Sequence, residues 1–183
     1  VKNLINKMKG TITLETKQGE GTTFTITLPV KLDMVCFEET ETEEEETSIE
    51  GMKILLVEDN DLNLEVAQYI LEDAGAEIIV ARNGLESVEL FEQSERDSFD
   101  VILMDIMMPV MDGLTATKRI RKLKRKDART VPVIAMTANV FNEDIIAAKE
   151  AGMNEHIAKP LDFDKLIHTL AKYFLKMDKK LIS

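Results

Sequence analysis

The sequence predicts an α/β fold, a doubly wound parallel sheet with helices on both faces. Three observations favour this fold. Short apolar runs alternate with amphipathic segments from residue 52 to about residue 175. The connections between them are short, and each crossover between parallel strands is right-handed and covers one face of the sheet. Several of the apolar runs are unbroken, which is typical of strands buried on both faces.

Five strand and helix pairs follow one another along this region. The expected strands are Lys53–Val57, Ile78–Ala81, Val101–Met104, Val133–Met136 and His156–Ala158. The expected helices are Leu62–Ala74, Leu85–Gln93, Leu114–Leu123, a helix from about Asn142 to Ala151, and Phe163–Leu175. In the strand order 2-1-3-4-5 this is a flavodoxin-like (βα)5 arrangement, in which ligands bind outside the carboxyl ends of the strands.

The first 37 residues have a different pattern. Apolar residues at helical spacing within residues 1–8 predict that the chain begins inside a short helix. Alternating segments at Thr11–Leu14 and Phe24–Leu28, on either side of a Gly-Glu-Gly turn, predict a β-hairpin. A lone hairpin is marginal in water. The apolar residues of this hairpin lack the parent domain that should cover them, and we expect them to pair with another chain or to lie against the α/β region.

Composition narrows the functional classes. The chain has 183 residues and a net charge of −11, which argues against direct nucleic-acid binding. No apolar run approaches the roughly 18 residues of a membrane span, so we expect no membrane contact by this fragment. Cys36 is the single cysteine, which favours a reducing, cytoplasmic location, with a membrane anchor left open for a longer parent protein. Glu38–Glu50 holds eight Glu and no base, the pattern of a solvated linker.

Polar residues stand at the ends of four expected strands. Glu58 and Asp59 follow the first strand, and the remaining three are Asp105, Thr137 and Lys159. Three carboxylates brought together repel one another, and a divalent cation relieves this repulsion. Mg²⁺ prefers such oxygen ligands and keeps open positions for phosphate oxygens. By itself, Asp105 fits either a nucleophile at a strand end or a capping carboxylate; the set of residues favours the nucleophile.

The segments around these residues resemble the receiver domain of two-component response regulators over nearly all of residues 52–175. The motifs are Val57-Glu58-Asp59-Asn60, the run from Met104 to Gly113, Ala135-Met136-Thr137-Ala138 and Ala158-Lys159-Pro160. The resemblance implies that Asp105 is the phosphoacceptor, assisted by Lys159 and Thr137. It also implies Mg²⁺ held by Glu58, Asp59, Asp105 and the backbone carbonyl of Met107.

Further roles follow from the same resemblance. His156, three residues before Lys159, stands where many receivers have a switching Tyr or Phe, so we expect Thr137 and His156 to form the switch. We expect the partner-facing surface around residues 138–160 and a dock for a phosphotransfer helix near Asn60 and Leu62. The side chains of Met107, Met108 and Met111 are expected to pack at the rim, and His168 at the surface or in packing.

The N-terminal segment resembles the end of the ATP-binding domain of sensor histidine kinases. The matching motifs are Lys9-Gly10-Thr11-Ile12, Gly19 to Phe24, and Leu28-Pro29, although Lys9 replaces the usual glycine. We therefore expect a kinase-domain remnant at 1–37, an acidic linker at 38–51 and a receiver at 52–183. This order implies a hybrid histidine kinase whose receiver takes phosphate from a phosphohistidine and passes it to a histidine phosphotransfer protein. This chain lacks counterparts of the ATP site and of the phosphorylated His, so it should catalyse only its own Asp phosphorylation and dephosphorylation.

Other functional classes fit the residues less well. A haloacid-dehalogenase-type phosphatase requires a second Asp two residues after the nucleophile, and this chain has Met107 at that position. A binding-only receiver would lack one of the five key polar residues, and all five are present. A stand-alone response regulator remains open, and only the N-terminal hairpin weighs against it.

Overall fold

The computed structural model describes residues 10–17, 21–27, 29, 48–138 and 142–181, and of 142–144 and 176–181 it describes the backbone alone. The chain divides into two units, residues 1–43 and 44–183. The expected helix within residues 1–8, most of the acidic linker, and Cys36 lie outside the described residues. Among the described helices, none is both long and apolar enough to span a membrane.

The first unit contains the predicted hairpin. Strands β1 (Thr11–Lys17) and β2 (Gly21–Thr27) pair antiparallel, with Leu14 opposite Phe24. The alternation of Thr with apolar residues gives each strand one apolar face. Leu14 and Phe24 are 57% and 65% exposed, so this face is open to solvent in the described part of the chain.

The second unit is built on a five-stranded parallel sheet. Its strands are β3 (Lys53–Val57), β4 (Glu77–Ala81), β5 (Val101–Asp105), β6 (Val133–Thr137) and β7 (Glu155–Ala158). They lie in the order β4-β3-β5-β6-β7, which confirms the predicted 2-1-3-4-5 order. Every residue of β5 and β6 is buried, as their unbroken apolar sequences predict.

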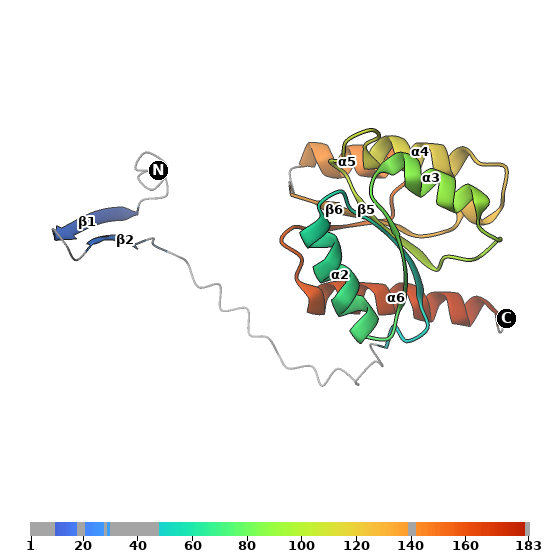
Figure 1. Cartoon of the computed structure of the whole chain (residues 1–183), viewed down its shortest axis with the longest axis horizontal. Coiled ribbons are helices and arrows are strands. Elements are labelled where there is room, and N and C mark those ends of the chain that lie inside the picture. Colours follow the sequence, from blue (N-terminus) through green and yellow to red (C-terminus); the bar gives the residue numbers. More distant parts are fainter. Residues whose placement is uncertain (1–9, 18–20, 28, 30–47, 139–141, 182–183) are drawn as a thin grey trace. The chain divides into compact units, whose positions relative to one another are not determined.

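Helices cover both faces of this sheet (Figure 1). Helices α3 (Gly84–Gln93), α4 (Gly113–Lys122) and α5 (Asn142–Ala151) lie on one face, and α2 (Asp61–Asp73) and α6 (Phe163–Leu181) on the other. Alternate residues of each strand supply the two cores: Leu55 packs with the α3–α5 side and Leu56 with the α2–α6 side. Asn60, Asn83 and Asp112 cap α2, α3 and α4 by accepting a hydrogen bond from the backbone N–H three residues on.

Two features of the fold differ from the sequence predictions. Helix α6 continues to Leu181, six residues beyond the predicted end, because no Gly or Pro follows Leu175 and the next residues are mostly good helix formers. Met111 is buried in the α3–α5 core, whereas we expected rim packing; its position before the start of α4 turns the side chain inward.

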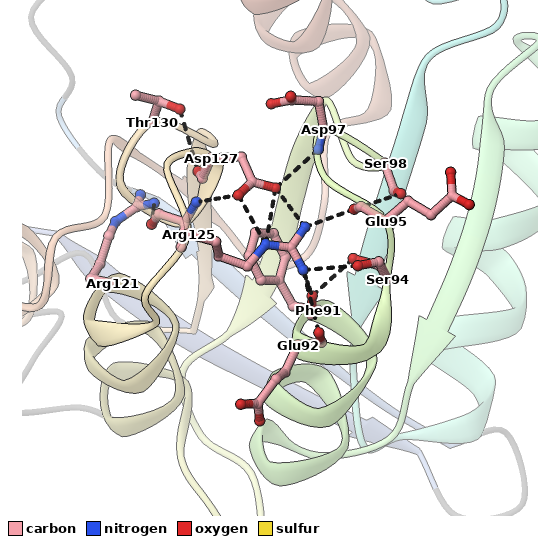
Figure 2. Close-up of polar contacts among 11 residues, drawn as sticks. Phe91, Glu92, Ser94, Glu95, Asp97, Ser98, Arg121, Arg125, Asp127 and Thr130 are labelled. Carbon is pink, nitrogen blue, oxygen red and sulfur yellow. Dashed lines mark hydrogen bonds and ion pairs between the residues drawn. The ribbon is translucent and has the colours of Figure 1, made fainter.

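A short 3-10 helix, η1 (Asp127–Arg129), was also not predicted. Arg125 and Asp127 organise the loop around it (Figure 2). The guanidinium of Arg125 lies 4.6 Å from the centre of the Phe91 ring and donates hydrogen bonds to backbone carbonyls at the end of α3. It also forms an ion pair with the buried Asp127 carboxylate at 2.6 Å. These contacts join the end of α3 to the segment that leads into β6.

Candidate functional site

The predicted polar residues meet at the carboxyl edge of the sheet. Asp105 and Thr137 are the last residues of β5 and β6, while Glu58 and Lys159 directly follow β3 and β7. Because these four strands are parallel neighbours in the order β3-β5-β6-β7, their carboxyl ends lie side by side. The sheet thus brings together residues that are far apart in the sequence, such as Glu58 and Lys159.

Lys159 connects two of the carboxylates. Its Nζ lies 2.6 Å from Asp105 Oδ2 and 2.5 Å from Glu58 Oε2, and all three side chains are largely buried. Burial alone would lower the pKa of Lys159, but its hydrogen bonds to Asp105 and Glu58 outweigh this and raise the pKa. Burial raises the pKa of Asp105, and the hydrogen bond from Lys159 opposes the rise. The ammonium therefore stays charged and partly neutralises the acidic cluster.

Three carboxylates have the geometry and chemistry of a cation site. Carboxylate oxygens of Glu58, Asp59 and Asp105 all lie within 4.8 Å of one another. Glu58 and Asp105 are buried, whereas Asp59 is exposed. Hard oxygen ligands, one side open to solvent and an excess of negative charge match the requirements of Mg²⁺. The donor set therefore fits the predicted metal.

Local contacts hold these carboxylates in place. Asn63 Nδ2 donates to Glu58 Oε1 at 3.0 Å from the first turn of α2. The backbone N–H of Met107 donates to Asp105 Oδ1 at 3.3 Å, while the Met107 side chain is 78% exposed. A Cβ on Gly113 would lie 2.1 Å from the Asp105 carbonyl oxygen, so only glycine lets α4 begin this close to the site. The supporting roles of Asn63 and Gly113 were not predicted from the sequence. The available signal for Asn63 was an Asn in the first helical turn after an acidic pair.

Thr137 and His156 lie on neighbouring strands. Thr137 is buried, and its carbonyl oxygen accepts a hydrogen bond from the Lys159 N–H at 2.8 Å. His156 is half-buried on β7 opposite Ala135 and lines a cleft of about 220 Å³ between β7 and α5. Their joint role as a switch stays a prediction, as does the metal contact of the Met107 carbonyl. His168, which we expected at the surface or in packing, is exposed on α6.

Comparisons with known proteins agree with this geometry. The family model described as the response regulator receiver domain matches residues 54–171. The aerobic respiration control sensor protein ArcB of Escherichia coli (strain K12) is 34% identical over 180 residues, which cover 97% of this chain and 22% of that protein. The chain spans less than a quarter of the length of the curated histidine kinases reported as similar to it.

Solved structures give the same result. The receiver domain of sensor histidine kinase PA1611 from Pseudomonas aeruginosa PAO1, described with a magnesium ion in its active site cleft, has a TM-score of 0.61 and 37% identity. That match covers 67% of this chain and 97% of the other. A Saccharomyces cerevisiae complex of the phosphotransfer protein Ypd1 with the Ssk1 receiver domain matches with a TM-score of 0.61 and 26% identity, covering 68% and 89%. The family match over most of the chain, the sheet order and the acidic site show that this chain belongs to the response regulator receiver domain family.

Proposed function

We propose that this receiver takes a phosphoryl group from a phosphohistidine onto Asp105 and passes it to the histidine of a phosphotransfer protein. The observation that carries the proposal is the buried Asp105 carboxylate, which shares one edge of the sheet with two further carboxylates and Lys159. This arrangement supplies a nucleophile and the charges needed to bind a phosphoryl group beside it.

The transfer exchanges one bond to phosphorus for another. An Asp105 carboxylate oxygen attacks the phosphorus, a P–O bond forms, and the P–N bond to the donor imidazole breaks. The imidazole leaves with the electron pair of that bond and takes up a proton. The Lys159 ammonium then turns from Asp105 toward a phosphoryl oxygen, and the Thr137 hydroxyl donates to another. Transfer to the next histidine runs through the same bonds in reverse.

Glu58, Asp59 and Asp105, with the Met107 carbonyl, would hold Mg²⁺. When bound, the cation would neutralise charge on the phosphoryl oxygens during the transfer. Support comes from the oxygen donor set described above and from the similar PA1611 receiver domain, whose description includes magnesium in its cleft. Lys159 by itself provides one positive charge against three carboxylates. This leaves an excess of negative charge that a bound cation would compensate.

A groove beside the site fits the docking of a phosphotransfer helix. It has a volume of about 260 Å³ and lies between the first turns of α2 and the segment after β7. Leu62 and Val66 contribute exposed apolar surface, and Glu58 and Lys159 also line the groove. Lys159 links it to the phosphoacceptor, because its ammonium contacts Asp105. An apolar helix face placed here would bring its histidine to Asp105. The similarity to the Ssk1 receiver, which was solved in complex with the phosphotransfer protein Ypd1, supports a phosphotransfer protein as the partner.

The N-terminal unit fits the end of a kinase ATP-binding domain. The proposed organisation is this remnant at 1–37, the acidic linker at 38–51 and the receiver at 52–183, as part of a hybrid histidine kinase. The alignment to ArcB, which covers 97% of this chain and so includes the hairpin, supports it. The exposed Leu14 and Phe24 would then be covered by the remainder of that domain.

A relay assay tests the proposal. A phosphotransfer domain labelled on its histidine is mixed with the wild-type chain, with Asp105→Asn, and with Asp73→Asn as a matched control at an exposed site. We expect label to move to the wild type and the control in Mg²⁺, to stay on the donor with Asp105→Asn, and to stop moving when a chelator is added. Transfer to Asp105→Asn at the wild-type rate would contradict the proposal.

A further inference from the structure

Helix α5 connects the two edges of the sheet. It follows β6, which ends at Thr137 in the candidate site, and it ends at Ala151 before the chain enters β7. In a parallel sheet the segment that follows a strand begins at the carboxyl edge and returns to the amino edge. One end of α5 therefore faces the phosphoacceptor and the other end lies at the opposite edge, about 15 Å away for ten residues of helix.

The far end of α5 is closed by a regular helix cap. Gly152 has a φ of +95°, its N–H donates to the Lys149 carbonyl, and the Met153 N–H donates to the Ala148 carbonyl. This is the Schellman pattern, which satisfies the last carbonyls of a helix. A Cβ at Gly152 would lie 3.2 Å from Cγ of Arg121, so the side chain of Arg121 packs directly on the cap.

Arg121 binds this cap from α4. Its Nε and one terminal nitrogen both donate to the Gly152 carbonyl, at 3.0 and 2.9 Å, and that nitrogen also donates to Asn154 Oδ1 at 3.0 Å. The other terminal nitrogen donates to the carbonyls of Ala128 and Val131, at 2.9 and 2.8 Å. All five hydrogen bonds described for this guanidinium go to uncharged carbonyl oxygens.

This geometry makes Arg121 a connection between three segments. Asn154 Oδ1, which accepts from Arg121, also accepts from the Val133 N–H at the start of β6. Arg121 thus joins the end of α5 to α4 and to the loop that leads into β6. The guanidinium is partly buried, and hydrogen bonds to a charged group are costly to break without replacement by water. Arg121 and Asn154 therefore hold the far end of α5 to α4 and to the loop that leads into β6.

We propose that Arg121 is a positioning residue that makes the C-terminal end of α5 a fixed pivot, so that a phosphoryl-dependent change at Thr137 is taken up by the N-terminal half of the helix. The inference rests on the proposed function, because it concerns the response to a phosphoryl group on Asp105. Arg121 does not touch the reacting atoms and acts through the cap at Gly152. Lysine at this position keeps the charge but cannot supply the planar fork of donors.

Hydrogen exchange on the whole chain tests the pivot. Amide exchange is followed in residues 142–147 and 148–154, with Mg²⁺ alone and with Mg²⁺ plus beryllofluoride as a phosphoryl mimic. The variants are Arg121→Lys and, as a matched control in the same helix, Arg119→Lys, because Arg119 is exposed. Binding of beryllofluoride is recorded independently by fluorine NMR.

In the wild type and the control we expect beryllofluoride to change exchange at least threefold in 142–147 and less than twofold in 148–154. In Arg121→Lys we expect 148–154 to exchange about tenfold faster already without beryllofluoride, and the mimic to change both segments, while its affinity stays within about twofold. A wild-type response equally large in both segments, or an Arg121→Lys pattern identical to the wild type, would overturn the pivot. If fluorine NMR shows no bound beryllofluoride, the proposed function is overturned. The anchor is then judged from exchange without the mimic, and equal exchange of residues 148–154 in the wild type and in Arg121→Lys would overturn it as well.

Discussion

Replacing Asp127 by Asn should destabilise the receiver in a pH-dependent way. The Asp127 carboxylate accepts hydrogen bonds from the Arg125 guanidinium and from the Asp97 and Ala128 N–H groups, and it is buried (Figure 2). The hydrogen bond from Arg125 is the largest of the effects that lower the pKa of Asp127 to about 2, from the ordinary value of 3.8. Asn keeps the shape of the side chain and removes the charge.

The difference between the native and unfolded pKa of Asp127 determines how much unfolding free energy the Asp127→Asn variant should lose. A native pKa below the unfolded value means that the ionised form stabilises the fold above about pH 4, and that this stabilisation is lost as the pH falls toward 2. A difference of nearly two pKa units corresponds to about 2 kcal/mol of unfolding free energy at pH 7 and to about 1 kcal/mol at pH 3. The wild type should exceed Asp127→Asn in stability by these amounts.

Urea unfolding at pH 7 and pH 3, followed by circular dichroism, measures both differences. Asp73→Asn is the control, because Asp73 is exposed at the end of α2 and its replacement should change stability by less than about 0.5 kcal/mol. A difference between wild type and Asp127→Asn that is equal at the two pH values would refute the reasoning, since it would show that the charge is not what stabilises the loop.

Three further predictions concern the site and its surroundings. Lys159→Gln should slow phosphorylation by acetyl phosphate about 100-fold at saturating Mg²⁺, because it removes the one described donor that touches both Asp105 and Glu58; a loss below threefold in initial rate would contradict its role. Leu62→Glu should slow transfer from a phosphotransfer domain at least tenfold and leave labelling by acetyl phosphate unchanged, since it places a charge in the apolar groove without touching Asp105; equal losses in the two assays would count against the dock. Val110→Gly should raise the free energy of unfolding in urea by roughly 0.5–1 kcal/mol. Val110 is 80% exposed and has a φ of +68°, a conformation that costs a β-branched residue about 1–2 kcal/mol. A loss of stability would show that the Val110 side chain makes stabilising contacts.

The strands and their ends could be predicted from simple patterns in the sequence, whereas the strand order was taken from the flavodoxin-like fold class that the alternation of strands and helices indicates. Unbroken apolar runs such as Val101–Met104 identify buried parallel strands, and the first polar residue after each run marks the carboxyl edge. Asp105, Thr137 and Lys159 could therefore be placed at one edge before any contact between them was known. The structure confirms the sheet order and places the Lys159 ammonium in contact with the Asp105 carboxylate.

The residues that hold the segments around the site in place could not be predicted from the sequence in the same way. The segment from Lys118 to Arg129 has the composition of a solvated basic surface, and nothing in it shows that Arg121 and Arg125 turn inward to backbone carbonyls. Most of their partners are main-chain oxygens of other segments, which have no sequence signature. The sequence showed Gly113 only as the end of the motif that begins at Met104, whereas its closeness to the Asp105 carbonyl depends on how α4 packs against β5. Backbone approach of this kind is a property of the tertiary structure.

The most direct measurement of the central claim is phosphate incorporation from acetyl phosphate, with and without Mg²⁺, on the wild type and on Asp105→Ala. The account predicts labelling that requires Mg²⁺, is stable to acid and labile to base, as expected of an acyl phosphate, and is absent in Asp105→Ala. Labelling that persists in Asp105→Ala, or its absence in the wild type with Mg²⁺ bound, would contradict the assignment of Asp105 as the phosphoacceptor.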